Sequence, residues 1–123
     1  MKVMKSAEDY LENILILQRK NGRVRSIDIV HSMDFSKPSI SIAMKNLKEL
    51  NLINMDKDGI ITLTPAGEEI ALEVYNRHCT IKNFFVKIGV PENIAEEDAC
   101  KIEHDISKES IAALKNFIDQ MGN

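Results

Sequence analysis

Apolar side chains in the first part of the chain recur at intervals of three and four positions, which places them on one face of a helix. The spacing predicts helices over residues 6–20, 26–33 and 38–50. Ser36 supplies an N-cap for the third helix, and Pro38 takes an early helical position where its missing N–H costs nothing. The second and third helices are short and separated by a tight turn, which is the pattern of a helix-turn-helix.

Two short apolar segments follow, over residues 52–55 and 60–63. They flank a polar turn that ends in Asp58 and Gly59, and an Asp-Gly pair supplies the positive φ that hairpin turns require. A hairpin directly after a helix-turn-helix is a wing. The pattern therefore predicts a winged helix-turn-helix.

The rest of the chain predicts three more helices, over residues 65–88, 91–105 and 107–121. Thr64 begins the first of them as N-cap, and Pro65 is its first helical residue. This long helix carries too many apolar residues for an exposed spacer. We expect it to pack against something large, such as a second subunit.

The predicted fold class is mainly α, with a winged helix-turn-helix domain over residues 1–64 and a helical domain over residues 65–123. The net charge of the chain is −3, but the two parts differ in charge. The first contains 10 Lys and Arg against 8 Asp and Glu, and the second contains 6 against 11. This asymmetry predicts that the first part faces phosphate and that the second faces cations or no charged partner.

Cysteine content and hydropathy indicate the cellular compartment of the protein. The chain of 123 residues has only two cysteines, Cys79 and Cys100, which are too few for a disulfide framework and fit a reducing cytoplasm. No stretch approaches the roughly 18 apolar residues of a membrane span, and the N-terminal residues lack a long apolar signal region. We expect a cytoplasmic protein that is neither secreted nor inserted into a membrane.

The predicted third helix has the properties of a recognition helix, whose N-terminal residues meet base edges in the major groove. Small hydroxyls there can approach bases or phosphates, an apolar side chain can meet a thymine methyl, and basic side chains can hold phosphates. The candidate DNA-binding residues are Arg25, Ser36, Lys37, Pro38, Ser39, Ile42, Lys45, Lys48 and Lys57. Any one of these lysines fits the solvated face of a helix equally well, but the whole array within a winged helix-turn-helix favours binding to double-stranded DNA.

A second group of polar residues lies in otherwise apolar helical stretches. Cys100, Glu103 and His104 stand at i, i+3 and i+4, which puts a thiol, a carboxylate and an imidazole on one face as a compact ligand set for a transition metal. His78, on the long helix, completes a possible cluster. Each residue alone also fits an ordinary role, such as a buried cysteine or a hydrogen-bonded histidine, so spacing leaves metal binding and packing both open.

Two acidic residues of the first helix form a related pair. Asp9 and Glu12 are three positions apart and therefore lie about 60° from each other at one edge of the buried face. Like charges at that spacing repel each other. Either acid alone also fits a helix N-terminal acid stabilised by the helix dipole.

Three segments around the winged helix-turn-helix carry a family resemblance: residues 8–12, residues 76–78 and residues 97–104. They resemble the diphtheria toxin repressor and manganese transport regulator family, and the Ala-Cys-x-x-Glu-His stretch is the most specific part. The resemblance implies a homodimer that binds palindromic operators when loaded with Fe(II) or Mn(II) and represses metal-uptake genes. Co(II), Ni(II) or Zn(II) would substitute in vitro, and the helical domain would serve metal binding and dimerisation.

Carried over by position, the family's metal ligands fall on Asp9, Glu12, His78, Cys100, Glu103 and His104. The two acids of the first helix match the manganese-sensing branch, whereas the cysteine matches the iron-sensing branch, so the ligand set is mixed and leans slightly to iron. The iron branch has an ancillary site at the positions of Lys82 and Glu96, and a charged lysine is not a ligand, so we expect that site to be altered or absent. Without metal the clustered anions would repel one another, and a bound dication would tie the two parts together.

The resemblance also implies what the protein is not. We expect no enzyme activity, no small organic substrate and no SH3-like C-terminal domain of the kind found in longer iron repressors. The main alternative is a winged-helix regulator that ignores metal. A metal-dependent hydrolase is a more remote alternative, because no nucleophile or oxyanion-stabilising pattern is visible.

Overall fold

A computed structural model describes residues 5–121 as two compact units, the first ending at Leu72 and the second beginning at Glu73. The elements follow in the order of three helices, a two-stranded hairpin and three further helices. This order confirms the predicted winged helix-turn-helix followed by a helical domain. Among the helices between residues 5 and 121, none combines the length and hydrophobicity needed to span a membrane.

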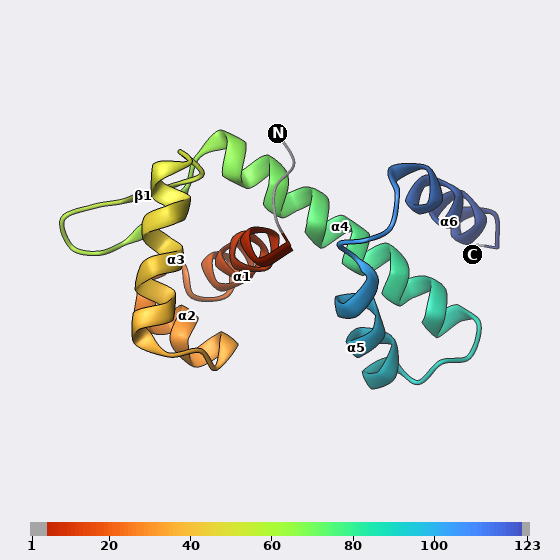
Figure 1. Ribbon diagram of the computed structural model, residues 1–123. Helices are drawn as coiled ribbons and strands as arrows, with labels where there is room; N and C mark the ends of the chain where they lie inside the picture. Colours follow the sequence, from red (N-terminus) through yellow and green to blue (C-terminus); the bar gives the residue numbers. More distant parts are fainter. Residues whose placement is uncertain (1–4, 122–123) are drawn as a thin grey trace. The chain divides into compact units, whose positions relative to one another are not determined.

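The first unit opens with helices α1 (Lys5–Asn21), α2 (Ser26–Met33) and α3 (Lys37–Glu49), shown in Figure 1. Helix α2 packs against both α1 and α3. The Ser36 hydroxyl caps α3 by accepting the backbone N–H of Ser39 at 3.2 Å, which confirms the predicted N-cap. The core of this unit consists of buried apolar side chains from these helices, from the hairpin and from the segments that connect them: Leu11, Ile14, Leu15, Leu17, Val24, Ile29, Ile40, Met44, Leu47, Leu52, Ile53 and Ile61.

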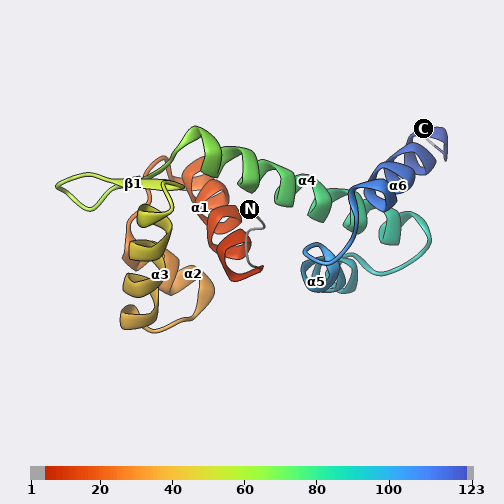
Figure 2. The same cartoon turned by 45° about the horizontal axis from the view of Figure 1, so that its top comes forward.

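The hairpin is a short antiparallel pair of β1 (Ile53–Met55) and β2 (Ile61–Leu63), which extends from the helices in Figures 1 and 2. Gly59 in its turn has a φ of +80°, as the Asp-Gly pair predicts. On its other edge β2 receives one more bridge, in which the N–H of Ile61 donates to the carbonyl of Val24 at 2.7 Å. The segment between α1 and α2 is thereby fixed against the wing.

The start of α4 (Pro65–Lys87) is locked onto the base of the hairpin. The Thr64 hydroxyl donates to the carbonyl of Asn51 at 2.8 Å and accepts the N–H of Gly67 at 3.1 Å, so it both caps the helix and ties it to the preceding segment. A Cβ on Gly67 would overlap the carbonyl oxygen of Leu52. Only glycine therefore permits this approach of helix to chain.

The second unit contains the remainder of α4 together with α5 (Glu92–Ile102) and α6 (Lys108–Met121). Helix α5 ends earlier than predicted, because residues 103–105 form a turn in which Glu103 is the C-cap. Glu103 keeps helical dihedral angles, with φ −60° and ψ −25°. The expected spacing of Cys100 and Glu103 on one face therefore holds, whereas His104 lies in the turn beyond the helix.

Helix α6 has an apolar face that the described chain does not bury. It has no buried residue, and Phe117 remains 48% exposed. An apolar groove of about 500 Å³ lies along this face, and its lining residues are Phe84, Ile106, Ser110, Ala113, Leu114 and Phe117. The rings of Phe84 and Phe117 meet edge to face at 6.0 Å, which connects α4 with α6.

Gly67→Ala is expected to lower the free energy of unfolding by about 2 kcal/mol, because the added methyl has to displace backbone rather than a flexible side chain. Glu69→Ala, on the exposed side of the same helix turn, is the matched control and is expected to change stability by less than about 0.5 kcal/mol. Urea denaturation followed by circular dichroism measures both. Equal stability of the two variants would contradict the close packing of α4 on Leu52.

Candidate metal centre and DNA-binding surface

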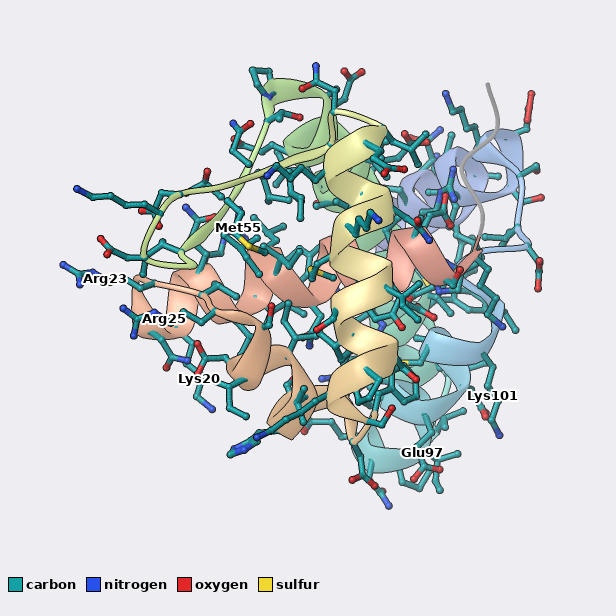
Figure 3. All side chains as sticks on the ribbon, turned by 60° about the vertical axis from the view of Figure 1, so that its left-hand side comes forward. Lys20, Arg23, Arg25, Met55, Glu97 and Lys101 are labelled. Atoms are coloured by element: carbon teal, nitrogen blue, oxygen red, sulfur yellow. The ribbon has the colours of Figure 1, made fainter. Side chains whose placement is uncertain are left out.

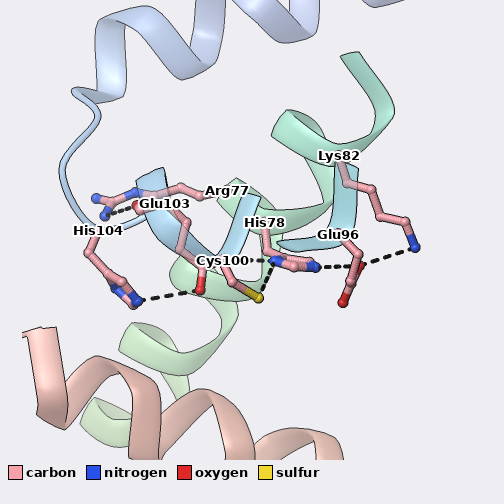
Figure 4. A network of polar contacts seen from close by, with 7 residues as sticks. All are labelled: Arg77, His78, Lys82, Glu96, Cys100, Glu103 and His104. Carbon is pink, nitrogen blue, oxygen red and sulfur yellow. Dashed lines mark hydrogen bonds and ion pairs between the residues drawn. The ribbon is translucent and has the colours of Figure 1, made fainter. Parts of the chain in front are cut away.

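The candidate metal centre is formed by side chains on the facing sides of two helices of the second unit, α4 and α5. On α5, Glu96, Cys100 and Glu103 stand at i, i+4 and i+7 and therefore share one side. On α4, His78 and Lys82 are one turn apart. Hydrogen bonds and ion pairs join the two helices, as Figure 4 shows.

Three different ligand types converge at the inner side of the His78 ring. Its Nδ1 atom lies 2.8 Å from Oε2 of Glu103 and 3.7 Å from Sγ of Cys100 (Figure 4). The imidazole nitrogen, the sulfur and the carboxylate oxygen all lie within 4.8 Å of one another. Glu103 is 1% exposed and His78 is 8% exposed, whereas Cys100 is exposed, so the cluster is buried on the side of Glu103 and His78 and open to water at the sulfur.

Glu103 lies between two imidazoles. Its Oε2 atom faces His78, and its Oε1 atom lies 3.4 Å from Nε2 of His104. A buried carboxylate is stable only with compensating partners, and the two imidazoles provide them. The turn that ends α5 therefore brings together two predicted ligands, the carboxylate of Glu103 and the imidazole of His104.

The outer side of the His78 ring has a second carboxylate partner. Its Nε2 atom lies 2.9 Å from Oε2 of Glu96. The hydrogen bond to Glu103 raises the pKa of His78 to about 9, which exceeds the lowering effect of burial, and Glu96 adds to the rise. Partial burial acts to raise the pKa of Glu96, but hydrogen bonds from His78 and Lys82 outweigh it, so this pKa lies below the ordinary value.

Arg77 fixes the end of α5 that carries the cluster. Its Nη1 atom donates to the backbone carbonyl of Glu103 at 3.4 Å, and its Nη2 atom pairs with Glu73 one turn earlier on α4 at 2.8 Å. A positive charge at a helix C-terminus also interacts favourably with the helix dipole. Arg77 was not among the residues that the sequence singled out, because a basic residue one turn from an acid on a helix commonly forms a surface pair.

The donor atoms suit a first-row transition metal ion. Thiolate sulfur and imidazole nitrogen favour softer ions such as Fe(II), Co(II) and Zn(II), while a carboxylate also accepts Mn(II). His78, Cys100 and Glu103 can hold such an ion, and His104 follows Glu103 directly. The hydrogen bond from Nε2 of His78 to Glu96 is the arrangement by which metal-binding histidines are commonly oriented.

The remaining predicted ligands lie in the first unit. Asp9 and Glu12 are both on α1, one helical turn apart, and the Glu12 side chain is buried. The structure therefore brings together four of the six predicted ligands in one unit and places the other two on one side of a single helix.

All nine candidate DNA-binding residues are exposed on the first unit. Ser36, Lys37, Pro38 and Ser39 occupy the N-terminal end of α3, and Ile42 is 63% exposed one turn further along. Most of this apolar side chain is therefore open to solvent. The start of α3 therefore presents hydroxyls, a positive charge and an apolar side chain to solvent.

Basic residues beside the wing extend this surface beyond the sequence prediction. Val24 pairs with β2 and is buried, so its neighbours Arg23 and Arg25 point to the outside. Figure 3 shows Lys20, Arg23 and Arg25 projecting from the same edge of the unit, near the hairpin. Only Arg25 was predicted. The alternation Arg-Val-Arg was the available signal for Arg23, since alternation places both arginines on one side of an extended segment.

Comparisons with known proteins agree with this architecture. Residues 64–122 match the family model described as iron dependent repressor, metal binding and dimerisation domain. The chain is 34% identical over 115 residues to the transcriptional regulator MntR of Escherichia coli O6:H1, which covers 94% of this chain and 74% of that protein.

Solved structures agree as well. The manganese regulator SloR has a TM-score of 0.80 and 28% identity over 97% of this chain. A manganese-dependent transcriptional repressor in complex with manganese has a TM-score of 0.82 and 26% identity over 89% of this chain. This chain spans about half of each of these structures, 55% and 51% respectively.

These matches extend over both units and confirm the resemblance that the sequence motifs indicate. The chain belongs to the diphtheria toxin repressor and manganese transport regulator family, whose members are metal-dependent transcriptional repressors rather than enzymes.

Proposed function

We propose that this protein is a cytoplasmic homodimer that binds a palindromic DNA operator when loaded with Fe(II) or Mn(II) and represses genes of metal uptake. The single observation that carries the proposal is the convergence of the His78, Cys100 and Glu103 donor atoms within 4.8 Å of one another. Such a set of nitrogen, sulfur and oxygen donors, in a chain that also contains a winged helix-turn-helix unit, suits a metal-responsive regulator better than a regulator that ignores metal.

The proposed ligands are His78, Cys100, Glu103 and His104 of the second unit, together with Asp9 and Glu12 of α1. Family membership supports the two acids of α1, because they occupy the positions that the resemblance assigns to ligands. When bound, the ion supplies two positive charges among these carboxylates and the thiolate. Ligands contributed by both units would make operator affinity depend on metal, and such couplings are typically about 5- to 150-fold.

The mixed donor set supports two candidate effectors. Cys100 favours Fe(II), whereas the carboxylates suit Fe(II) and Mn(II) alike. One similar repressor has been solved in complex with manganese. We propose Fe(II) or Mn(II) as the effector in the cell, with Co(II), Ni(II) and Zn(II) as substitutes in vitro.

The unburied apolar face of α6 supports the homodimer. Phe117 is exposed on this face, and the adjoining groove is lined mainly by apolar side chains from α4, from α6 and from Ile106 just before α6. The family model that matches these residues is a dimerisation domain. A second copy of the chain is therefore the proposed occupant of this face, and a dimer presents two recognition helices to the two halves of a palindrome.

The proposed DNA contacts are those of the exposed surface described above. Ser36, Ser39 and Ile42 would meet base edges, and the basic residues of α3 and the wing would hold phosphates. Arg23 joins the basic residues because it lies beside Arg25 at the edge of β2.

Cys100→Ser tests the metal centre and the function together. In anaerobic Co(II), the wild-type protein is expected to show thiolate-to-cobalt charge-transfer absorption in the near ultraviolet, and metal is expected to raise operator affinity about 5- to 150-fold over chelator. Cys100→Ser is expected to lose the absorption band and most of the metal effect. Fluorescence anisotropy of a labelled palindromic operator candidate measures the affinity.

The matched control for this experiment is Cys79→Ser, which removes the other cysteine and is expected to retain both signals. His104→Ala is expected to lose the metal effect on operator binding while circular dichroism stays unchanged. Operator binding that is equal in Fe(II), Mn(II) and chelator would refute the proposed function.

The raised pKa of His78 predicts a pH dependence for the metal-free protein. Because the folded pKa of His78 is about 9 and its ordinary value is 6.5, the stabilisation is fully present below about pH 6.5 and is lost as pH rises through 9. The loss is expected to be on the order of 3 kcal/mol in wild type and to be largely removed in His78→Gln. Urea denaturation of chelator-treated protein between pH 6 and pH 9.5 measures it, and parallel curves for the two proteins would contradict the prediction.

Lys45→Ala and Lys48→Ala are each expected to weaken binding to all DNA sequences and to lower the slope of log affinity against log salt by about 1, because each removes one phosphate contact. The control is Lys87→Ala at the exposed end of α4, which removes the same charge from the second unit and is expected to leave the slope unchanged. A loss confined to the operator sequence would instead indicate that these lysines contact bases.

A further inference from the structure

The side of His78 that faces away from Cys100 and Glu103 already contains a cation. The ammonium nitrogen of Lys82 lies 3.2 Å from Oε2 of Glu96, and the same carboxylate oxygen lies 2.9 Å from Nε2 of His78. Figure 4 shows the resulting row of His78, Glu96 and Lys82 along the outer edge of the centre. On this side of the ring, the carboxylate of Glu96 therefore lies between Nε2 of His78 and the ammonium group of Lys82.

A second carboxylate approaches the same ammonium group. Oε1 of Glu92, at the start of α5, lies 3.5 Å from Nζ of Lys82. Glu92 and Glu96 are one helical turn apart, so they reach Lys82 from the same side of α5. The hydrogen bond and the charge of Glu96, followed by the charge of Glu92, hold the pKa of Lys82 above its ordinary value.

This arrangement differs from an ordinary surface ion pair in one respect. The ammonium group contacts an acid that is itself bonded to a proposed metal ligand, and the Lys82 side chain is 28% exposed. Two carboxylates and an imidazole nitrogen are donors that a divalent ion accepts. An ammonium group at this place supplies charge to the acids but has no lone pair for a metal.

We propose that the Lys82 ammonium group fills a cation position on the outer side of His78 and excludes metal ions from it. This inference rests on the proposed function, because it treats His78 as a ligand of the inner ion. The consequence is that the chain binds fewer ions per subunit than its acidic and imidazole groups could hold. Glu96 then acts as a positioning residue that accepts the Nε2 proton of His78 and directs Nδ1 toward Cys100 and Glu103.

The test replaces Lys82 by a residue whose side chain can bind a metal ion. Lys82→Glu is expected to bind about one more ion per subunit than the wild-type protein, since a third carboxylate joins Glu92 and Glu96 while the proton on Nε2 of His78 stays in place. Lys82→His is a second variant that adds a neutral ligand without a further negative charge and is expected to show the same gain. Equilibrium dialysis against Mn(II) and Co(II), followed by elemental analysis, counts the ions in the full-length protein.

Two controls identify the added ion. Lys87→Glu makes the same change of charge at an exposed position of α4 and is expected to bind the same number of ions as wild type. Adding Glu96→Gln to Lys82→Glu is expected to remove the gain, because the acid shared by His78 and residue 82 is then lost.

The outcomes separate this inference from the proposed function. Equal ion counts in wild type and both Lys82 variants would overturn the inference alone, and so would a gain in Lys87→Glu. Absence of bound ions from every protein, wild type included, would overturn the proposed function and the inference with it. A gain in either Lys82 variant that disappears with Glu96→Gln would establish the inference.

Discussion

The second unit depends on one buried carboxylate, that of Glu103, and on what neutralises it. At 1% exposure it has lost nearly all contact with water, and an uncompensated charge in such a place is strongly unfavourable. His78 and His104 approach its two oxygens from opposite sides. The turn after α5, the anchoring of its carbonyl by Arg77 and the protonation of His78 all follow from the need to hold this group.

On the outer side of His78, the negative charge of Glu96 is compensated in the same way, here by the ammonium group of Lys82. His78 contacts Glu96, and Glu96 contacts Lys82, so acids and bases alternate across the two helices. The sequence predicts that clustered anions repel one another when no metal is present. In the second unit, however, His78 contacts both Glu96 and Glu103, and Lys82 contacts both Glu92 and Glu96.

Local patterns predicted most of the fold, whereas the site depended on contacts that a sequence does not display. The helices, the wing, the caps at Ser36 and Thr64 and the turn at Gly59 follow from periodicity and from residues with one strong conformational preference. The end of α5 was placed too late, because a helical pattern continues through residues whose backbone is held instead by Arg77. Spacing alone does not predict the row from His78 to Lys82, since it joins helices whose register is set by tertiary packing. The family resemblance, by contrast, placed Lys82 and Glu96 at one site.

Metal binding to the inner cluster would compete with the proton that His78 carries. The hydrogen bond to Glu103 raises the pKa of His78 to about 9, so the ring is protonated at neutral pH. Only a neutral imidazole nitrogen can act as a ligand, so this proton has to leave before Nδ1 binds a metal ion. The contact that stabilises the metal-free protein is therefore the one that a metal ion would replace, and metal affinity would rise with pH.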